Sequence, residues 1–214
     1  MAGRLSHELR TPIAVVRSSL ENLKLAPTPE ESHTYIARAE EGLARLSRIL
    51  ARMGEASRLE QGLSTVARER FDAVPVVRGC VEGYRLAYAP RTFELDLPAT
   101  PLTVEGAPDL LAQMLDKLAE NAADFALPGT PVRVSLVATG GRVQLAVENE
   151  GPAIPDSLRD ALFGSMVSGR AGHSGSDPHL GLGLYVTRLI AEFHGGGVDA
   201  ENLPRGVRIV VTLP

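Results

Sequence analysis

A histidine with chemically useful neighbours lies near the start of the chain, in the segment Ser6-His7-Glu8-Leu9-Arg10-Thr11-Pro12. A neutral imidazole presents a nitrogen lone pair and can act as a nucleophile. On a helix, Glu8 could accept the imidazole proton, and Thr11 at i+4 would share the face of His7 and could hold a water or a phosphate oxygen. A lone helical histidine is more often a surface or core residue. The surrounding pattern favours chemistry here, and we expect His7, Glu8 and Thr11 to be catalytic.

Two asparagines in the second half of the chain are candidate nucleotide ligands. Asn121 lies within a helical apolar pattern, although asparagine has a low helix propensity. Its amide oxygen could bind Mg2+, and a tolerated surface amide fits the pattern equally well. Asn149 ends an alternating apolar strand and precedes Gly151. An amide at this position could meet a base edge, where the glycine would allow close approach.

A loop and a pair of glycines complete the candidate nucleotide site. Phe163 precedes a run rich in glycine and serine over residues 164–178, which predicts a mobile loop. Such a loop is either a linker or a lid over a nucleotide. The segment Leu180-Gly181-Leu182-Gly183-Leu184 then opens a helix, whose N-terminal N–H groups and dipole favour phosphate. This order of segments favours the lid.

Apolar spacing predicts that the histidine lies on a helical hairpin over residues 1–64. Apolar residues recur every three or four positions on both sides of Pro27-Thr28-Pro29, which is typical of coiled-coil packing. Thr28 or Pro29 should open the second helix, since Glu30 and Glu31 suit its first turn. The seam is longer than two helices can cover, so we expect a homodimer whose hairpins form a four-helix bundle. The seam residues are Leu9, Ile13, Val16, Leu20, Leu23, Ile36, Ala39, Leu43, Leu46, Leu50 and Met53.

The remaining residues, 65–214, mix helical and strand patterns. They predict an α+β sandwich in which helices cover one sheet, with a β-hairpin around Gly140-Gly141. The expected helices span 74–88, 107–127 and 180–194, and the expected strands span 93–97, 102–106, 132–137, 142–149 and 207–213.

The composition favours a globular intracellular enzyme. The chain has 214 residues, 44% of them hydrophobic, and its single cysteine, Cys80, excludes a disulfide framework and is expected to be inert packing. A net charge of −4 predicts no nucleic-acid partner. The sequence contains no transmembrane run or signal peptide. Because it begins only six residues before His7, we expect a fragment that lacks input segments.

The ordered motifs resemble the cytoplasmic catalytic core of a bacterial two-component sensor histidine kinase over essentially the whole chain. The resemblance implies a dimerising helical hairpin followed by an ATP-binding α/β sandwich of the type shared with gyrase and chaperone ATPases. A fainter likeness is to a proteobacterial subgroup associated with sortases. The matching segments are a phospho-acceptor box at 7–12, an N box at Asn121, a first glycine box at 149–155, a phenylalanine box at Phe163 and a second glycine box at 181–184.

The resemblance also implies roles for single residues. His7 would take the γ-phosphoryl group of ATP while Glu8 accepts its proton, and the group would pass to an aspartate on the receiver domain of a response regulator. Thr11 would support dephosphorylation of that regulator. The chain would be the cytoplasmic portion of an inner-membrane sensor, anchored by segments outside this sequence. The implied contacts of Mg2+ and ATP are Asn121 on the metal, Asn149 and Gly151 near adenine, Phe163 in the lid, and Gly181, Leu182, Gly183 and Leu184 near the phosphates.

Several positions depart from the family pattern, and two of them are candidate nucleotide ligands. Asn149 stands where the family usually has aspartate, and Lys117 stands where it often has a first asparagine. Lys117 could contact phosphate or displace part of the magnesium site. Two other functions therefore stay open, a dimeric scaffold without ATP turnover and a serine kinase or other ATPase of the same superfamily. A hairpin that carries His7-Glu8 argues against the superfamily alternative.

Overall fold

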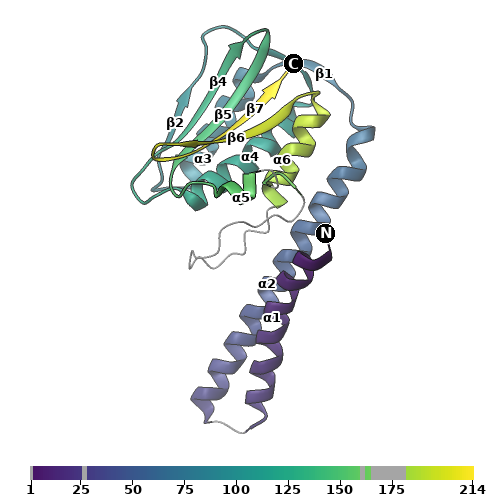
Figure 1. The fold of residues 1–214 in the computed structure, drawn as a ribbon, viewed down its shortest axis with the longest axis vertical. Helices are drawn as coiled ribbons and strands as arrows, with labels where there is room; N and C mark the ends of the chain where they lie inside the picture. The colour runs from purple at the N-terminus through teal and green to yellow at the C-terminus, as the bar shows by residue number, and fades with distance from the viewer. Residues whose placement is uncertain (1, 26–27, 160–161, 165–181) are drawn as a thin grey trace.

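The protein consists of a long helical hairpin and an α/β domain that packs against one end of it (Figure 1). The structure is a computed structural model. It describes residues 2–25, 28–159, 162–164 and 182–214, without the side chains of residues 2–8 and 159. In this part of the chain, no helix is both long enough and apolar enough to cross a membrane.

Helices α1 (Ala2–Leu23) and α2 (Pro29–Gly62) form the hairpin. α2 begins where the sequence predicts, directly after Thr28, and the structure shows a capping box at this residue. The Glu31 side chain accepts the Thr28 backbone N–H at 2.9 Å, and the Thr28 hydroxyl accepts the Glu31 N–H at 3.4 Å. These bonds satisfy donors that a helix start leaves unpaired. A short 3-10 turn, η1 (Leu63–Thr65), follows α2 and leads toward the α/β domain.

The two helices of the hairpin approach each other closely at Gly42. A Cβ atom at this position would lie 2.7 Å from Val16 Cγ2 and 3.2 Å from the Pro12 carbonyl oxygen. Pro12 lies inside α1 and is buried against α2, and its ring leaves the helix without one internal N–H donor. A glycine on α2 therefore allows close contact with α1 at this level.

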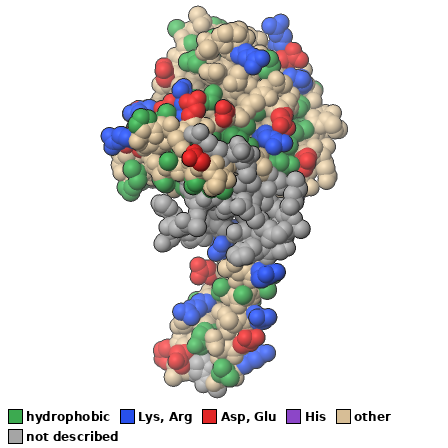
Figure 2. Space-filling model, viewed as in Figure 1, with side chains coloured by type: hydrophobic (Ala, Val, Ile, Leu, Met, Phe, Trp, Pro, Cys, Tyr) green, Lys and Arg blue, Asp and Glu red, His purple; other side chains and the backbone are tan. Residues whose placement is uncertain are grey.

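Only part of the expected seam is buried between the two helices. Five seam residues repeat at seven-residue spacing along each helix and stay exposed in the single hairpin, which agrees with a seam too wide for two helices. We call them the exposed stripe: Ile13 (52% exposed), Leu20 (47%), Ile36 (42%), Leu43 (53%) and Leu50 (59%). Elsewhere on the hairpin face seen in Figure 2, basic and acidic side chains are interspersed.

The α/β domain is built on a five-stranded sheet of order β2-β4-β5-β7-β6. β2 pairs with β4 in parallel, and the other neighbours are antiparallel. Two further strands, β1 and β3, form a separate antiparallel pair. The strands are β1 (Glu69–Asp72), β2 (Phe93–Asp96), β3 (Thr103–Gly106), β4 (Val132–Thr139), β5 (Arg142–Glu150), β6 (Gly197–Leu203) and β7 (Gly206–Leu213).

Three helices cover one face of the sheet and form the core with it (Figure 1): α3 (Ala73–Ala87), α4 (Pro108–Phe125) and α6 (Leu182–Phe193). A fourth, α5 (Asp156–Arg159), is a single turn. Apolar residues of β5 alternate with polar ones, which places one set in the core and the other on the open face. The predicted sandwich of one sheet covered by helices is therefore confirmed.

Most predicted elements are confirmed, with small differences at their ends. α4 ends at Phe125 rather than at Leu127 because Ala126 is extended, two residues before Pro128. β2 ends at Asp96, near Pro98 in the sequence. The expected helix 180–194 is described from Leu182 onward. β1 and β6 were not predicted, since each carries charged residues in place of a clear apolar alternation.

Candidate active site

The candidate phospho-acceptor segment lies on α1. Helix α1 includes positions 7 and 8, but the side chains of His7 and Glu8 lie outside the described part of the structure. Thr11 is described and its side chain is exposed. Leu9, within the same turn, packs against the hydrophobic core. The backbone of residues 7 and 8 is therefore helical, as the sequence analysis assumes.

Asn121 lies on α4, the helix with the largest buried face. Its side chain is partly exposed and borders a stripe that includes Leu118 and Ala122, which are buried. Lys117 precedes Asn121 by one turn and shares its side of the helix. Packing of the stripe against the sheet fixes the direction in which both polar side chains leave α4.

Lys117 pairs with the hairpin in this structure. Its ammonium lies 3.1 Å from Glu55 Oε1 on α2 and 4.0 Å from Glu120 Oε2. Arg52, one turn before Glu55, lies 3.1 Å from Glu120 Oε1. Gln113 also donates to Glu55 Oε1 at 3.5 Å. We call Arg52, Glu55, Lys117 and Glu120 the ion-pair ring, because each cation in it meets an anion of the opposite helix.

Sequence analysis placed Lys117 near phosphate or magnesium but missed its partners. Arg52 and Glu55 are three residues apart on one helix, and Lys117 and Glu120 are three residues apart on another. The spacing puts each pair on one helix face. No sequence signal tells that these two faces meet, because the two pairs lie far apart along the chain.

Asn149 is the second-last residue of β5 and lies on the side of the sheet that faces the helices. Its side chain is buried, at 7% exposure, and its amide donates to the Glu150 carbonyl oxygen at 3.4 Å. Gly151 follows and is required by the backbone, since a Cβ there would lie 2.3 Å from the Phe125 carbonyl oxygen and 3.0 Å from Asn149 Nδ2. The close approach expected at Gly151 is thus an approach to the end of α4.

The second glycine segment opens α6, as expected. Leu182 and Leu184 are buried in the core, whereas Gly183 has no atom within 4 Å of the position its Cβ would take. Leu182 and Leu184 can therefore contribute to a phosphate site only through their backbone N–H groups. Gly181 and residues 165–180 lie outside the described residues. Phe163 is described and packs against the core.

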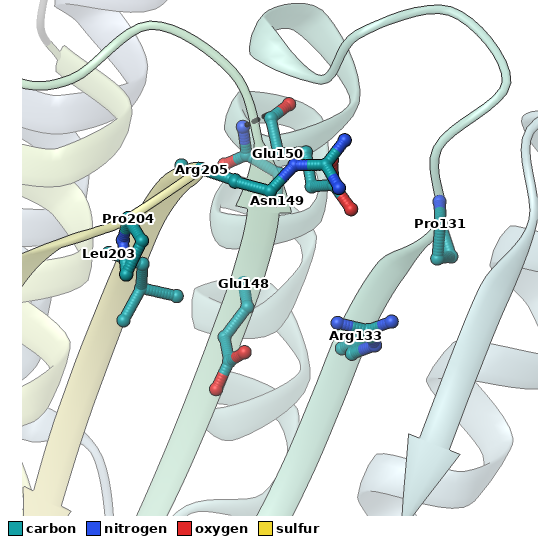
Figure 3. Close-up of a pocket in the computed structure, with 9 residues that line it drawn as sticks. Pro131, Arg133, Glu148, Asn149, Glu150, Leu203, Pro204 and Arg205 are labelled. Atoms are coloured by element: carbon teal, nitrogen blue, oxygen red, sulfur yellow. Dashed lines mark hydrogen bonds and ion pairs between the residues drawn. The ribbon is translucent and has the colours of Figure 1, made fainter.

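A pocket of about 240 Å3 lies on the open face of the sheet (Figure 3). Its charged lining residues are Arg133 of β4, Glu148 and Glu150 of β5, and Arg205 of the turn between β6 and β7, and each pairs with an oppositely charged side chain. Glu148 lies 3.1 Å from Arg208, and Arg205 reaches over the end of β5 to lie 3.1 Å from Glu150. Asn149, the predicted adenine contact, is one of the residues that line this pocket.

His194, the last predicted residue of the third helix, is a buried structural group. Its Nδ1 lies 2.8 Å from the Ile190 carbonyl oxygen, and its Nε2 accepts the Ala107 N–H at 3.2 Å. This arrangement requires the neutral ring protonated at Nδ1. Burial lowers the pKa of His194, against the opposing effect of the hydrogen bond to the Ile190 carbonyl oxygen. The histidine joins the end of α6 to the start of α4.

Cys80 agrees with the expectation of inert packing. Burial raises its pKa, and the nearby Asp116 carboxylate raises it further. Asp116 also accepts a hydrogen bond from the Tyr84 hydroxyl at 2.5 Å. A thiol in such surroundings stays protonated at neutral pH and is a poor nucleophile.

The residues present fit a nucleotide with Mg2+. In the described part of the chain, no group of three His, Cys, Asp or Glu side chains could form a metal cage. Mg2+ is usually held by one or two protein oxygens together with water and substrate phosphates. Asn121 can supply such an oxygen, and the N-terminus of α6 can supply backbone donors.

Comparison with known proteins supports two domains. Residues 1–62 match the His Kinase A (phospho-acceptor) domain, and residues 106–214 match the family described as histidine kinase-, DNA gyrase B- and HSP90-like ATPase. The fold and motifs therefore define a two-domain histidine kinase core. The chain belongs to the histidine kinase-, DNA gyrase B- and HSP90-like ATPase family. A phospho-acceptor domain precedes the ATPase domain in the sequence.

Curated relatives match the whole chain. Sensor protein ChvG of Rhizobium meliloti is 29% identical over 100% of this chain and 40% of its own length. Sensor-type histidine kinase PrrB of Mycobacterium tuberculosis is 32% identical over 98% of this chain and 46% of its own length. The chain therefore spans less than half the length of these relatives.

Solved structures share the fold. The mycobacterial sensor histidine kinase MprB is 27% identical and aligns with a TM-score of 0.59 over 69% of this chain and 97% of its own. Histidine kinase ThkA, in its complex with the response regulator TrrA, is 23% identical and aligns with a TM-score of 0.73 over 100% of this chain and 60% of its own. The second alignment includes both the hairpin and the α/β domain.

Proposed function

We propose that this chain is the core of a sensor histidine kinase that binds ATP with Mg2+, phosphorylates itself on His7 and passes the phosphoryl group to an aspartate of a response regulator. One observation carries the proposal. α2 is paired with the helix of His7, and it also contacts α4 and α6, the helices that hold Asn121 and the described part of the second glycine segment. The phospho-acceptor helix and the nucleotide site thus share one support.

The proposed reaction is an in-line displacement at the γ-phosphorus. A ring nitrogen of His7 donates its lone pair to phosphorus, while the bond to the bridging oxygen breaks and its electrons leave with ADP. Glu8 takes the proton from the other ring nitrogen. Mg2+ would neutralise phosphate charge, and catalysis of this kind is mainly positioning and electrostatic stabilisation. In the reverse direction of signalling, the Thr11 hydroxyl orients a water toward the phosphorylated regulator.

The nucleotide contacts of the proposal follow the sequence assignments. Asn121 holds Mg2+ through its amide oxygen, and Asn149 accepts from the adenine amino group. Gly151 and Phe163 shape the site through backbone and packing, and the backbone N–H groups of 181–184 bind phosphate. Lys117 reaches phosphate only when it leaves Glu55.

The exposed stripe supports a homodimer. Leu43 and Leu50 lie seven residues apart on α2, and Ile13 and Leu20 lie seven apart on α1. This spacing is the one that coiled-coil contacts use. A second copy of the hairpin would cover the stripe and complete a four-helix bundle. We place the boundary between the dimerisation domain and the ATP-binding domain at 64/65, within η1.

The relatives' names support a place in signalling. ChvG and PrrB are named as sensors, and the chain corresponds to less than half of either one. We propose that the chain works on the cytoplasmic side of an inner membrane, attached through segments outside this sequence.

The test follows the γ-phosphoryl group. The chain is incubated with γ-labelled ATP and Mg2+, and a receiver domain is then added. A kinase incorporates label and transfers it to the receiver domain, with the label lost from the chain as it appears there. A scaffold incorporates none, and a serine kinase or plain ATPase gives an acid-stable product or free phosphate only.

A further inference from the structure

The ion-pair ring, together with the hydrogen bond from Gln113 to Glu55, contributes polar contacts between α2 and the α/β domain. Lys117 and Glu55 are joined by two contacts, 3.1 Å to Oε1 and 3.4 Å to Oε2. Arg52 and Glu120 close the other side at 3.1 Å. The ring holds two positive and two negative charges, so it is neutral as a whole. Removal of any one member leaves an unbalanced charge at this contact.

Lys117 is the most enclosed member of the ring. Its side chain is 20% exposed, compared with 37% for Glu55 and 41% for Glu120. A partly enclosed ammonium needs an anion nearby, because water covers little of its charge. In this structure Glu55 is the closer of its two anionic partners. The hairpin therefore supplies the main counter-ion of a lysine that belongs to the α/β domain.

The same lysine lies one helical turn from the proposed magnesium ligand. Lys117 and Asn121 are at i and i+4 on α4, so they share a face. A lysine has a flexible four-carbon stem and three donors that can turn from one anion to another. Phosphate oxygens bound near Asn121 would carry more negative charge than a single carboxylate. They are the natural competitor of Glu55 for this ammonium.

An apolar contact runs alongside the ring. Met53 and Leu59 of α2 pack against the core, as does Tyr185 of α6, and α2 and α6 are in contact. The apolar contact does not depend on Lys117. A change in the ring can therefore weaken the attachment of the α/β domain without removing all of it.

We propose that Glu55 is a positioning residue that competes with nucleotide phosphates for Lys117, so that contact with the hairpin lowers nucleotide affinity and bound nucleotide loosens that contact. The inference rests on the proposed function, since it deepens the account of the ATP site. The two effects are one coupling seen from either side, because affinity linkage is reciprocal.

The experiment measures the Kd of a non-hydrolysable ATP analogue with Mg2+ for the whole chain and for Glu55→Gln, Lys117→Gln and the double variant. Glu55→Gln keeps the shape of the side chain and removes its charge. We expect it to tighten binding about fivefold to tenfold, at the low end of the coupling found between two sites. Lys117→Gln should weaken binding, and adding Glu55→Gln to it should change nothing more. Thermal unfolding of each variant without nucleotide establishes that it is folded.

The matched control is Glu41→Gln, which removes the same charge from an exposed position of α2 nearer to the hairpin turn. It should leave Kd unchanged. The gain from Glu55→Gln should also shrink at high salt, because added ions screen a partly exposed pair. A merely structural role of Glu55 would give neither this salt dependence nor the dependence on Lys117.

Three results would overturn the inference. These are an unchanged or weaker Kd in Glu55→Gln, an equal gain in the Lys117→Gln background, and an equal gain from Glu41→Gln. If the whole chain binds no nucleotide, the proposed function fails together with the inference. If the chain binds nucleotide and Glu55→Gln leaves the Kd unchanged, only the inference fails.

Discussion

His194 Nε2 accepts the backbone N–H of Ala107 at 3.2 Å, and this bond joins the end of α6 to the residue that precedes α4. Both helices carry candidate nucleotide residues. The bond therefore holds the two sides of the candidate site in a fixed relation. It forms only while the imidazole is neutral, since a protonated ring has no acceptor.

The stability of the protein should fall as pH is lowered through the titration of His194. Burial lowers its folded-state pKa below the ordinary 6.5. Below that ordinary value the unfolded chain binds a proton that the folded chain does not, so the free energy of unfolding decreases with falling pH until the folded-state pKa is reached. The stabilisation that depends on neutral His194 is fully present above the ordinary pKa.

The variant His194→Gln isolates this effect. At pH 7 the free energy of unfolding should fall by about 1–3 kcal/mol, because the buried Ala107 N–H is left without its partner. Urea unfolding from pH 7.5 to pH 5 measures the difference in the free energy of unfolding between the parent and the variant. This difference should become smaller as pH falls. A constant difference across this range would contradict the assignment of the titration to His194.

Gly106→Ala should destabilise the same region. A Cβ at Gly106 would overlap the His194 ring, 1.9 Å from its Cδ2 atom. The ring is buried and fixed at both nitrogens, so the backbone must shift, at a cost of about 1–3 kcal/mol. The control is Gly79→Ala on α3, where nothing lies within 4 Å of the added atom. That variant should be neutral or gain up to about 1 kcal/mol in helix propensity. Equal effects of the two substitutions in thermal unfolding would disprove the overlap.

Leu43→Glu should dissociate the proposed dimer and leave each chain folded. The leucine is 53% exposed on the single hairpin, so a charge there is tolerated in the monomer and excluded from a bundle interior. Sedimentation of the variant should give a single-chain mass where the parent gives twice that mass. Leu86→Glu is the control, since this leucine of α3 is 84% exposed and lies outside the hairpin. A dimer that survives Leu43→Glu would place the interface elsewhere.

Asn149→Asp should change affinity and stability in opposite directions. A carboxylate can accept a charge-assisted hydrogen bond from the adenine amino group, which we expect to tighten analogue binding about threefold to tenfold. Without nucleotide, the same carboxylate is buried, because the side chain at this position is only 7% exposed. It also cannot donate the hydrogen bond that the Asn149 amide gives to the Glu150 carbonyl oxygen. The melting temperature of the free protein should therefore fall. Calorimetric titration and thermal unfolding measure the two effects, and a change of both in the same direction would contradict the adenine assignment.

The sequence predicts the parts of this protein that depend on local pattern. The start of α2 after Thr28 and the strands on both sides of Gly140-Gly141 are local features, and they are confirmed. The short strands β1 and β6 escape prediction because their stability comes from pairing with β3 and β7. Likewise, the pairing of Lys117 with Glu55 depends on how two helices meet in space. The sequence also could not show why position 151 requires glycine, because a side chain there would collide with the Phe125 backbone, which is distant in the sequence.

The central claim is that His7 receives the phosphoryl group. The most direct measurement incubates the chain and its His7→Gln variant with γ-labelled ATP and Mg2+, and then treats the products with acid and with base. A phosphoramidate on the chain gives label that is lost in acid, kept in base and absent from the variant. Analogue binding to the variant, measured alongside, should match that of the parent. Equal label in the variant, or label that survives acid, would contradict the assignment of His7.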